Sequence, residues 1–496
     1  MIYRSTRDNS VNVGAAHAIA RGIAPDGGLY LPRSLPRLDT ARLSGLAKMD
    51  YKGRALDILC DFLNDFDREA LARSIDIAYG SCFASEKVTP VVELCPGAYM
   101  LELWHGPTCA FKDLALQLLP HLITQAAKKE AGGKTVNILV ATSGDTGKAA
   151  LEGFKDASGT NIFVFYPRDG VSRVQELQMT TQRGNNVMVC GVRGNFDDTQ
   201  AALKKIFTNT EIKARLDAQN AIFSSANSIN WGRLAPQIVY YVSAYCELVN
   251  SGELSLGEKL NIAVPTGNFG NILAAYYAGK MGLPVGRLIC ASNRNNVLTD
   301  FISTGVYDRR REFFATSSPS MDILVSSNLE RLLHALTGED DSAVSGFMSA
   351  LSRDGVYTLP SQVLNALKTD FYGGFCDETE TQATIKDAFQ NLKYLCDPHT
   401  AVALKVYRDY GKKTGDSTKT LIASTASPFK FTGNVLAALT GQPGSGDEFA
   451  QLQELSKLTG ISIPPQIVEL EHLPVRFEQT CEKNDMERVV LESLGL

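Results

Sequence analysis

Short runs of apolar residues alternate with amphipathic stretches through most of the chain. The apolar runs are rich in β-branched residues and continuous, which is typical of strands that are buried on both faces of a sheet. The stretches between them have helical periodicity over about ten residues each. The predicted strands are residues 136–141, 161–167, 187–192, 261–265, 287–292 and 419–425. This alternation predicts an α/β fold with parallel sheets and crossover helices.

Two glycine-containing segments follow predicted strands directly and precede predicted helices. Residues 142–147 read TSGDTG, and residues 266–271 read TGNFGN. Backbone N–H groups in such a turn, together with the positive end of the helix dipole, can bind an anion. The second segment lacks both the GxGxxG of a dinucleotide loop and the Lys-Ser/Thr of a Walker A loop. Taken alone, each segment is equally or better explained as an ordinary helix cap or connecting turn.

Three regions, residues 1–90, 336–395 and 441–496, fall outside the alternation and suggest a division into domains. Residues 1–90 are mostly helical and are expected to form a separate N-terminal domain. Residues 91–440 form the expected α/β core, with small and large subdomains and a polar, helical insertion at about residues 336–395. Residues 441–496 are expected to pack on that core as a C-terminal arm of strands and helices.

The composition is that of an ordinary folded enzyme and argues against several other classes of protein. The 496 residues include 49 basic and 54 acidic ones, for a net charge of −5, and no basic stripe indicates nucleic acid. No run of about 18 apolar residues could span a bilayer, and no signal peptide is evident. Ten cysteines without CxxC and six histidines without HExxH argue against a disulfide framework and a metal site. We therefore expect a cytoplasmic protein that binds neither nucleic acid nor membrane.

One lysine stands in an otherwise apolar neighbourhood. Lys112 lies between Phe111 and Asp113, in a segment from 105 to 119 with few other charges. Such a lysine more often reaches water with its head group while its stem covers apolar surface. Alternatively, burial lowers the pKa of its amine, which then becomes a nucleophile for a carbonyl group.

Two further segments carry polar groups that could contact a ligand. Residues 423–431 end a predicted strand with Ser and Thr, whose hydroxyl groups could offer a neutral hydrogen bond to a ring nitrogen. Residues 225–233 end on Arg233, a bidentate donor suited to phosphate. Neither segment is informative alone. Together with the amine and the two glycine loops, they supply what a parallel-sheet pyridoxal phosphate enzyme needs: an amine for the aldehyde, donors for its phosphate, and a site for a substrate carboxylate.

The chain resembles the bacterial and fungal type of threonine synthase in an ordered set of segments. These are LWHGPTCAFKD, ATSGDTG, SANSINWGR, VPTGNFGN, ASNRNN, SPSMDI, DPHTAVA and STASPFKF. The N-terminal YRSTRDN and ARGIAPDGGLYLP are similar to that family's N-terminal domain. The similarity covers about residues 1–440 and is weakest in the C-terminal arm. It implies a PLP-dependent fold type II, like that of the tryptophan synthase β-subunit, with pyridoxal 5′-phosphate as the cofactor.

The resemblance also implies roles for individual residues. Lys112 matches the lysine that binds the cofactor aldehyde and later acts as the base at the substrate Cα. Asp145 is expected beside the cofactor 3′-hydroxyl, and Thr425 beside the pyridine nitrogen. The residues that match the cofactor-phosphate loop are Gly267, Asn268, Phe269, Gly270 and Asn271. The residues expected to bind the substrate are Thr142, Ser143 and Thr146 for its carboxylate, and Asn227 and Arg233 for its phosphate.

The reaction that the resemblance implies converts O-phospho-L-homoserine and water to L-threonine and phosphate. A phospho-lyase that releases 2-oxobutyrate would use the same loops, and a non-catalytic homologue that only binds the cofactor is a further alternative. His105 and His399 are expected at helix starts or in packing rather than in the chemistry. The chain is expected to be a monomer or a homodimer.

Overall fold

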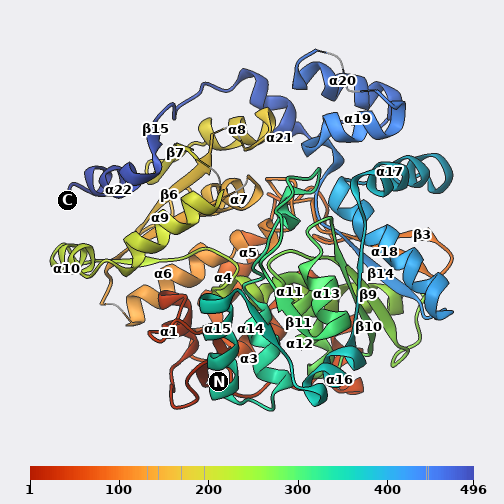
Figure 1. The fold of residues 1–496 in the computed structure, drawn as a ribbon, viewed down its shortest axis with the longest axis horizontal. Coiled ribbons are helices and arrows are strands. Elements are labelled where there is room, and N and C mark those ends of the chain that lie inside the picture. Colours follow the sequence, from red (N-terminus) through yellow and green to blue (C-terminus); the bar gives the residue numbers. More distant parts are fainter. Residues whose placement is uncertain (131, 143, 169, 195, 443, 445) are drawn as a thin grey trace.

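Two largely parallel sheets form the body of the protein (Figure 1), and the structure, a computed structural model, describes residues 1–130, 132–142, 144–168, 170–194, 196–442, 444 and 446–496. The larger sheet has the strand order β13 (Phe371–Phe375), β10 (Val285–Ser292), β9 (Leu260–Pro265), β14 (Thr420–Ser424), β4 (Ala98–Glu102) and β3 (Val91–Cys95). The smaller sheet has the order β15 (Thr480–Glu482), β7 (Val187–Arg193), β6 (Thr160–Pro167), β5 (Thr135–Ala141) and β8 (Ala221–Ser224). Within these two sheets only the β3–β4 pair is antiparallel. The predicted α/β fold with parallel sheets is therefore confirmed.

Helices pack against both sheets, as the apolar strand pattern requires. Those that contact the larger sheet include α11 (Trp231–Asn250), α12 (Gly270–Met281), α13 (Val297–Thr304), α16 (Ser361–Asp370) and α18 (Pro398–Thr414). Those that contact the smaller sheet include α6 (Leu119–Glu130), α7 (Asp145–Phe154), α9 (Phe196–Thr208) and α10 (Thr210–Ala218), and α8 (Arg173–Thr180) packs on α7. Helix α11 is apolar on nearly all sides and is buried along most of its length. It therefore lies at the centre of the hydrophobic core.

The N-terminal region is mostly helical, as its sequence predicts. It contains α1 (Ala15–Arg21), α2 (Thr40–Ala47), α3 (Tyr51–Phe62) and α4 (Arg68–Ala78), with a small antiparallel pair of β1 (Tyr3–Ser5) and β2 (Tyr30–Pro32). Tyr3 and Phe62 pack their rings against Trp231 of α11. Arg54 of α3 is buried and pairs with Glu247 of α11 at 2.9 Å. These contacts join the N-terminal helices and the body in one hydrophobic core.

The segment 336–395 differs from the helical insertion that its sequence suggested. It does contain α15 (Asp341–Asp354), α16 and α17 (Glu378–Leu392), but β13 lies between these helices and forms one edge of the larger sheet. Two glycines in β13 obscured its strand pattern. They are required there because a Cβ on Gly374 would lie 2.6 Å from Val406 Cγ1 of α18, and one on Gly373 would lie 3.1 Å from Thr299 Cα of α13. The remaining short elements nearby are β11 (Val306–Asp308), β12 (Val356–Thr358) and α14 (Leu329–Leu336).

The C-terminal arm crosses from the larger sheet to the smaller one, and is blue in Figure 1. It follows α19 (Thr432–Thr440), and its elements are α20 (Glu448–Thr459), α21 (Pro465–Val468), η3 (Glu469–His472), β15, η4 (Lys483–Asp485) and α22 (Met486–Leu494). Strand β15 pairs in parallel with β7, and the thiols of Cys481 and Cys190 lie 3.5 Å apart. Among the helices that the structure describes, none has the length and apolar character needed to cross a membrane.

Candidate cofactor and substrate site

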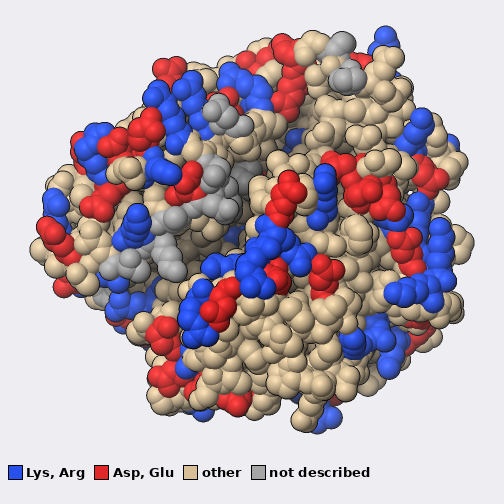
Figure 2. Space-filling model, in the orientation of Figure 1, with Lys and Arg blue, Asp and Glu red and all other residues tan. Residues whose placement is uncertain are grey.

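A cavity of about 1560 Å³ opens where strands β5, β9 and β14 end. Figure 2 shows a hollow near the middle of one face of the molecule, with lysine and arginine side chains at its border. The expected site residues that line the cavity are Lys112, Thr142, Thr146, Asn227, Arg233, Gly267, Asn268, Phe269, Gly270, Asn271 and Thr425. Ser143 lies outside the described residues. Asp145 lies directly behind the wall and is buried.

Lys112 is held in place by backbone contacts with the segment that follows β14. It directly precedes α5 (Asp113–Leu116), and the N–H of Phe111 donates to the carbonyl of Thr425 at 2.8 Å. The N–H of Ser427 donates in turn to the carbonyl of Cys109 at 3.0 Å. The Lys112 side chain is only 10% exposed. Burial lowers its pKa to about 8, although the nearby carboxylate of Asp145 acts in the opposite direction. The second of the two sequence-based interpretations of Lys112, a buried amine with a lowered pKa, therefore fits the structure.

Ser320 links the amine of Lys112 to the glycine loop at residues 266–271. Its hydroxyl accepts a hydrogen bond from Lys112 Nζ at 3.1 Å. Its backbone oxygen lies so close to the glycine loop that a Cβ on Gly267 would be 2.5 Å away. Ser320 belongs to the short helix η1 (Pro319–Met321). Ser320 thus lies between the amine of Lys112 and the glycine loop and is close to both.

The loop that precedes α12 has the features of an anion site. Phe269 caps the helix in the left-handed conformation, with φ of 66°, and the first turn carries no acidic side chain. The first N–H groups of a helix have no partner within it and point towards its N-terminus. The carbonyls of Gly267 and Asn268 are bound by Ser326 Oγ at 2.7 Å and by Asn328 Nδ2 at 3.0 Å, which fix the loop. An added Cβ on Gly270 would meet nothing closer than 3.6 Å, so the backbone is open to close approach there. Together with the helix N-terminus, this suits a cofactor phosphate.

The loop that precedes α7 is organised differently. The hydroxyl oxygen of Thr142 accepts hydrogen bonds from the N–H groups of Gly144 at 3.0 Å and Gly147 at 2.8 Å. Helix α7 then begins at Asp145, whose carboxylate accepts from Lys430 Nζ at 2.7 Å and from Gln175 Nε2 at 3.2 Å. Thr142 therefore caps its own loop, and an internal carboxylate occupies the helix N-terminus.

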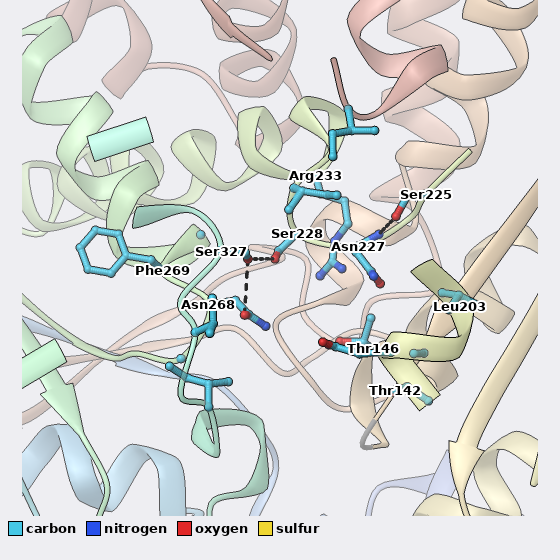
Figure 3. Close-up of a pocket in the computed structure, with 18 of the residues that line it drawn as sticks. Thr142, Thr146, Leu203, Ser225, Asn227, Ser228, Arg233, Asn268, Phe269 and Ser327 are labelled. Atoms are coloured by element: carbon cyan, nitrogen blue, oxygen red, sulfur yellow. Dashed lines mark hydrogen bonds between the residues drawn. The ribbon is translucent and has the colours of Figure 1, made fainter. Parts of the chain in front are cut away.

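Arg233 and Asn227 face the same cavity from the start of α11. In Figure 3 the guanidinium of Arg233 and the amide of Asn227 point into the space above Thr146. Arg233 Nη1 donates to the carbonyl of Ala226 at 2.9 Å, whereas its buried Nε has no partner among the described residues. Burial lowers the pKa of Arg233 to about 10. Among the described residues no carboxylate pairs with Arg233, and a buried cation at a cavity wall is suited to a second anion, such as a substrate phosphate.

Thr425 follows β14 and is fixed on both sides. Its carbonyl accepts from Phe111, and its N–H donates to the hydroxyl of Thr400 at 3.3 Å. The residue lines the cavity and is 5% exposed. The structure thus places an uncharged residue at this wall, with Lys112 anchored beside it, which fits a neutral hydrogen bond to a ring nitrogen.

Three residues at the site were not among those predicted from the sequence. Ser320 contacts Lys112, and Lys430 contacts Asp145, as described above. His399 lies at the start of α18, as expected, but it also lines the cavity; it accepts from the Ser320 N–H at 3.2 Å and pairs with Asp397 at 2.7 Å. By contrast, His105 stacks on Trp104 and bonds to Glu102, a packing role as expected.

Comparison with known families defines the class of protein first. Residues 85–425 match the family model described as pyridoxal-phosphate dependent enzyme. The cofactor is therefore pyridoxal 5′-phosphate and the fold is type II, as the resemblance implied. Residues 2–79 match the model for the threonine synthase N terminus, and residues 400–490 match the model for the threonine synthase C-terminal region, which extends the similarity beyond residue 440.

Individual relatives narrow the class further. Threonine synthase of Saccharomyces cerevisiae is 35% identical over 497 residues, which cover 94% of this chain and 95% of that protein. The PLP-bound threonine synthase of Brucella melitensis has a similar structure, with a TM-score of 0.88 and 36% identity over 100% of this chain and 98% of that one. The chain thus belongs to the threonine synthase family. Human threonine synthase-like 1 is 42% identical over 435 residues, which cover 86% of this chain but only 58% of that relative's length.

Proposed function

We propose that the protein converts O-phospho-L-homoserine and water to L-threonine and phosphate. The observation that carries the proposal is that one cavity is lined by a buried amine, by a helix N-terminus and by a separate buried guanidinium group. The α12 loop suits the cofactor phosphate, and Arg233 with Asn227 suits a second phosphate on the substrate. An enzyme acting on unphosphorylated serine or threonine would have no use for the buried guanidinium of Arg233.

In this proposal the bound cofactor supplies an electron sink for the negative charge that develops on the substrate carbons. Lys112 would hold the cofactor through its aldehyde, and its amine would take and return protons at the substrate Cα and Cβ. A pKa of about 8 suits this role, because an acid or base works best near the ambient pH. Thr142, Ser143 and Thr146 hold the substrate carboxylate, and Asn227 and Arg233 hold its phosphate until it leaves. Thr425 would offer the pyridine nitrogen a neutral partner.

Product analysis with O-phospho-L-homoserine tests the reaction. We expect equal amounts of phosphate and L-threonine. Lys112→Ala should lose at least about a hundredfold in rate, because it removes the acid–base group. Lys148→Ala is the matched control: Lys148 is also largely buried, but it pairs with Glu152 and does not line the cavity. Release of 2-oxobutyrate instead of threonine would identify the related phospho-lyase, and binding of the cofactor without any turnover would identify a non-catalytic homologue.

The second phosphate site has its own test. Arg233→Gln should lower kcat/KM for O-phospho-L-homoserine by between about tenfold and a hundredfold, since hydrogen bonds to charged groups contribute about 1.5–3 kcal/mol. The amount of bound cofactor should not change. L-Homoserine, which lacks the phosphate, should inhibit the variant and the wild type equally well. An equal loss of affinity for both compounds would assign Arg233 to the structure of the site instead.

A further inference from the structure

A second lysine is completely buried beside the cavity. Lys430 lies in the short helix η2 (Pro428–Lys430), between Phe429 and Phe431, and has no exposed surface. Its Nζ donates to Asp145 Oδ1 at 2.7 Å and to the carbonyl of Thr108 at 3.0 Å. It therefore connects the end of β14 with the start of α7, on the other sheet. An ammonium group in such a place needs a counter-charge, and Asp145 provides it.

The other oxygen of Asp145 faces Lys112. Asp145 Oδ2 accepts from the Ser320 hydroxyl at 3.2 Å and lies 4.0 Å from Lys112 Nζ. The same carboxylate is thus shared by two lysines, of which only Lys112 lines the cavity. A lone carboxylate at this distance would favour the ammonium form of Lys112, since an opposite charge raises the pKa of an amine. The proposed chemistry needs that amine without its proton.

We propose that Lys430 sets the protonation of Lys112 by neutralising Asp145. Lys430 is a positioning residue: it contacts neither the substrate nor the cofactor, and acts through the carboxylate. With Lys430 in place, the Asp145–Lys430 pair carries no net charge, and Asp145 offers hydrogen-bond acceptors to its neighbours much as an amide would. The inference rests on the proposed role of Lys112 as the amine that binds the cofactor, and is independent of the substrate's identity.

Other charged or titratable groups also face these side chains, and all of them are retained in the variants used below. Arg233 faces Lys112, and His399 faces Asp145. Asp113 and Cys109 face Lys430. Arg233 and Lys430 both act to lower the pKa of Lys112. The pKa of Asp145 lies well below its usual range despite burial, because Lys430 and Lys112 favour its charged form.

The test is a pH titration of the visible absorption of the holoenzyme, in which the cofactor is bound through Lys112. Lys430→Met leaves Asp145 uncompensated, and should raise the midpoint at which the bound nitrogen loses its proton by about one unit or more. Asp145→Asn should lower the midpoint, because the Lys430 ammonium is then unopposed. The double variant Asp145→Asn/Lys430→Met should titrate close to the wild type. Lys430→Arg keeps the charge and should also stay close to the wild type.

Lys148→Met is the matched control for the loss of a lysine next to α7. Lys148 pairs with Glu152 at 3.0 Å and does not line the cavity, so its removal should leave the midpoint unchanged. If the visible absorption of the wild type does not change within the pH range in which the protein is stable, a second measurement takes its place. It is the rate at which acetic anhydride acetylates Lys112 in the cofactor-free protein, followed by mass spectrometry. At neutral pH the rate should fall about tenfold in Lys430→Met, because each unit of pKa changes the neutral fraction tenfold.

The outcomes separate this inference from the proposed function. If Lys112→Ala abolishes the visible band, but all Lys430 and Asp145 variants titrate and react like the wild type, the pair is only structural and the inference is overturned. If Lys112→Ala keeps the band, the proposed role of Lys112 fails first. If Lys430→Met does not fold, Asp145→Asn and the double variant provide the test. A shift of the pH midpoint in Asp145→Asn that the double variant reverses is expected only if the effect is one of charge.

Discussion

The loops before α7 and α12 occupy equivalent positions between a strand and a helix, but they differ in the charge at the start of the helix. Each follows a parallel strand, contains glycine and leads into a helix at the wall of one cavity. The first turn of α12 has no acidic side chain. Helix α7 begins with Asp145, whose carboxylate is held by Lys430. Because a helix N-terminus favours negative charge, the α12 loop is left for an anion of the ligand, whereas the α7 loop already contains an anion of the protein.

This difference changes what can be expected of each loop. The α12 loop can bind a phosphate through backbone N–H groups and the helix dipole alone. At the α7 loop, the Asp145 carboxylate lies at the first residue of the helix and is neutralised by Lys430. A substrate carboxylate would therefore gain less from the helix dipole there, and its binding would rely more on hydroxyl groups such as that of Thr146. Thr142 is already used as an acceptor by two backbone N–H groups, and keeps only its hydroxyl proton to donate.

Removal of the protein's own anion should have the largest effect. Asp145→Ala leaves the Lys430 ammonium buried without a counter-charge, which should lower the free energy of unfolding by about 3–5 kcal/mol. Urea denaturation of the cofactor-free protein measures it. Asp145→Ala/Lys430→Met removes both charges and should recover most of the loss. If the single variant were as stable as the wild type, the α7 loop would not depend on its internal ion pair.

A side chain at Gly267 should affect the α12 loop next most strongly. The added Cβ of Gly267→Ala would lie 2.5 Å from the Ser320 backbone oxygen, so the loop and η1 must move apart. Overpacking of this kind costs about 1–3 kcal/mol, and should weaken cofactor binding by between about tenfold and a hundredfold. Equilibrium dialysis with the cofactor gives the affinity. Gly45→Ala in α2, where a Cβ meets nothing within 4 Å, should bind the cofactor normally. Unchanged affinity in Gly267→Ala would argue that the phosphate lies elsewhere.

The smallest effect is expected at Thr142. Thr142→Val keeps the shape of the side chain but leaves the N–H groups of Gly144 and Gly147 without their acceptor. The free energy of unfolding should fall by about 1 kcal/mol, as for other lost caps. Thr142→Ser retains the oxygen and should restore most of the stability. A rise in KM in Thr142→Val that Thr142→Ser reverses would support the proposed second role of the hydroxyl group, a hydrogen bond to the substrate carboxylate. Unchanged stability in Thr142→Val would contradict the capping role.

Much of the fold followed from the sequence because buried parallel strands are continuous apolar runs. Strands β5, β6, β7, β9, β10 and β14 all lie within two residues of the predicted ranges. Strands β3, β4, β8 and β13 of the two sheets had no predicted range. In β13, Gly373 and Gly374 interrupt the apolar pattern, and the cause lies in tertiary packing, because α13 and α18 come too close for side chains there. Local periodicity carries no information on such an approach.

The site was predictable to a similar degree. Its glycine loops and Lys112 stand out locally, and the structure brings them to one cavity. Lys430 lies between two phenylalanines and, like Lys112, is a lysine in apolar surroundings. Its segment was interpreted only through its hydroxyl groups. Ser320 and His399 lie in SPSMDI and DPHTAVA, two segments that resemble the family, but no local pattern indicates their contacts. These contacts form only when η1 and α18 pack at the cavity wall.

The last strand of the chain also determines what the smaller sheet presents to other molecules. Strand β15 covers the side of β7, and the sheet then ends in three residues on one flank and in the four residues of β8 on the other. Short edge strands offer few free backbone groups for pairing with a foreign strand. Without the C-terminal arm, the seven residues of β7 would be open to strand addition. The arm therefore covers a seven-residue strand that would otherwise be an edge of the sheet.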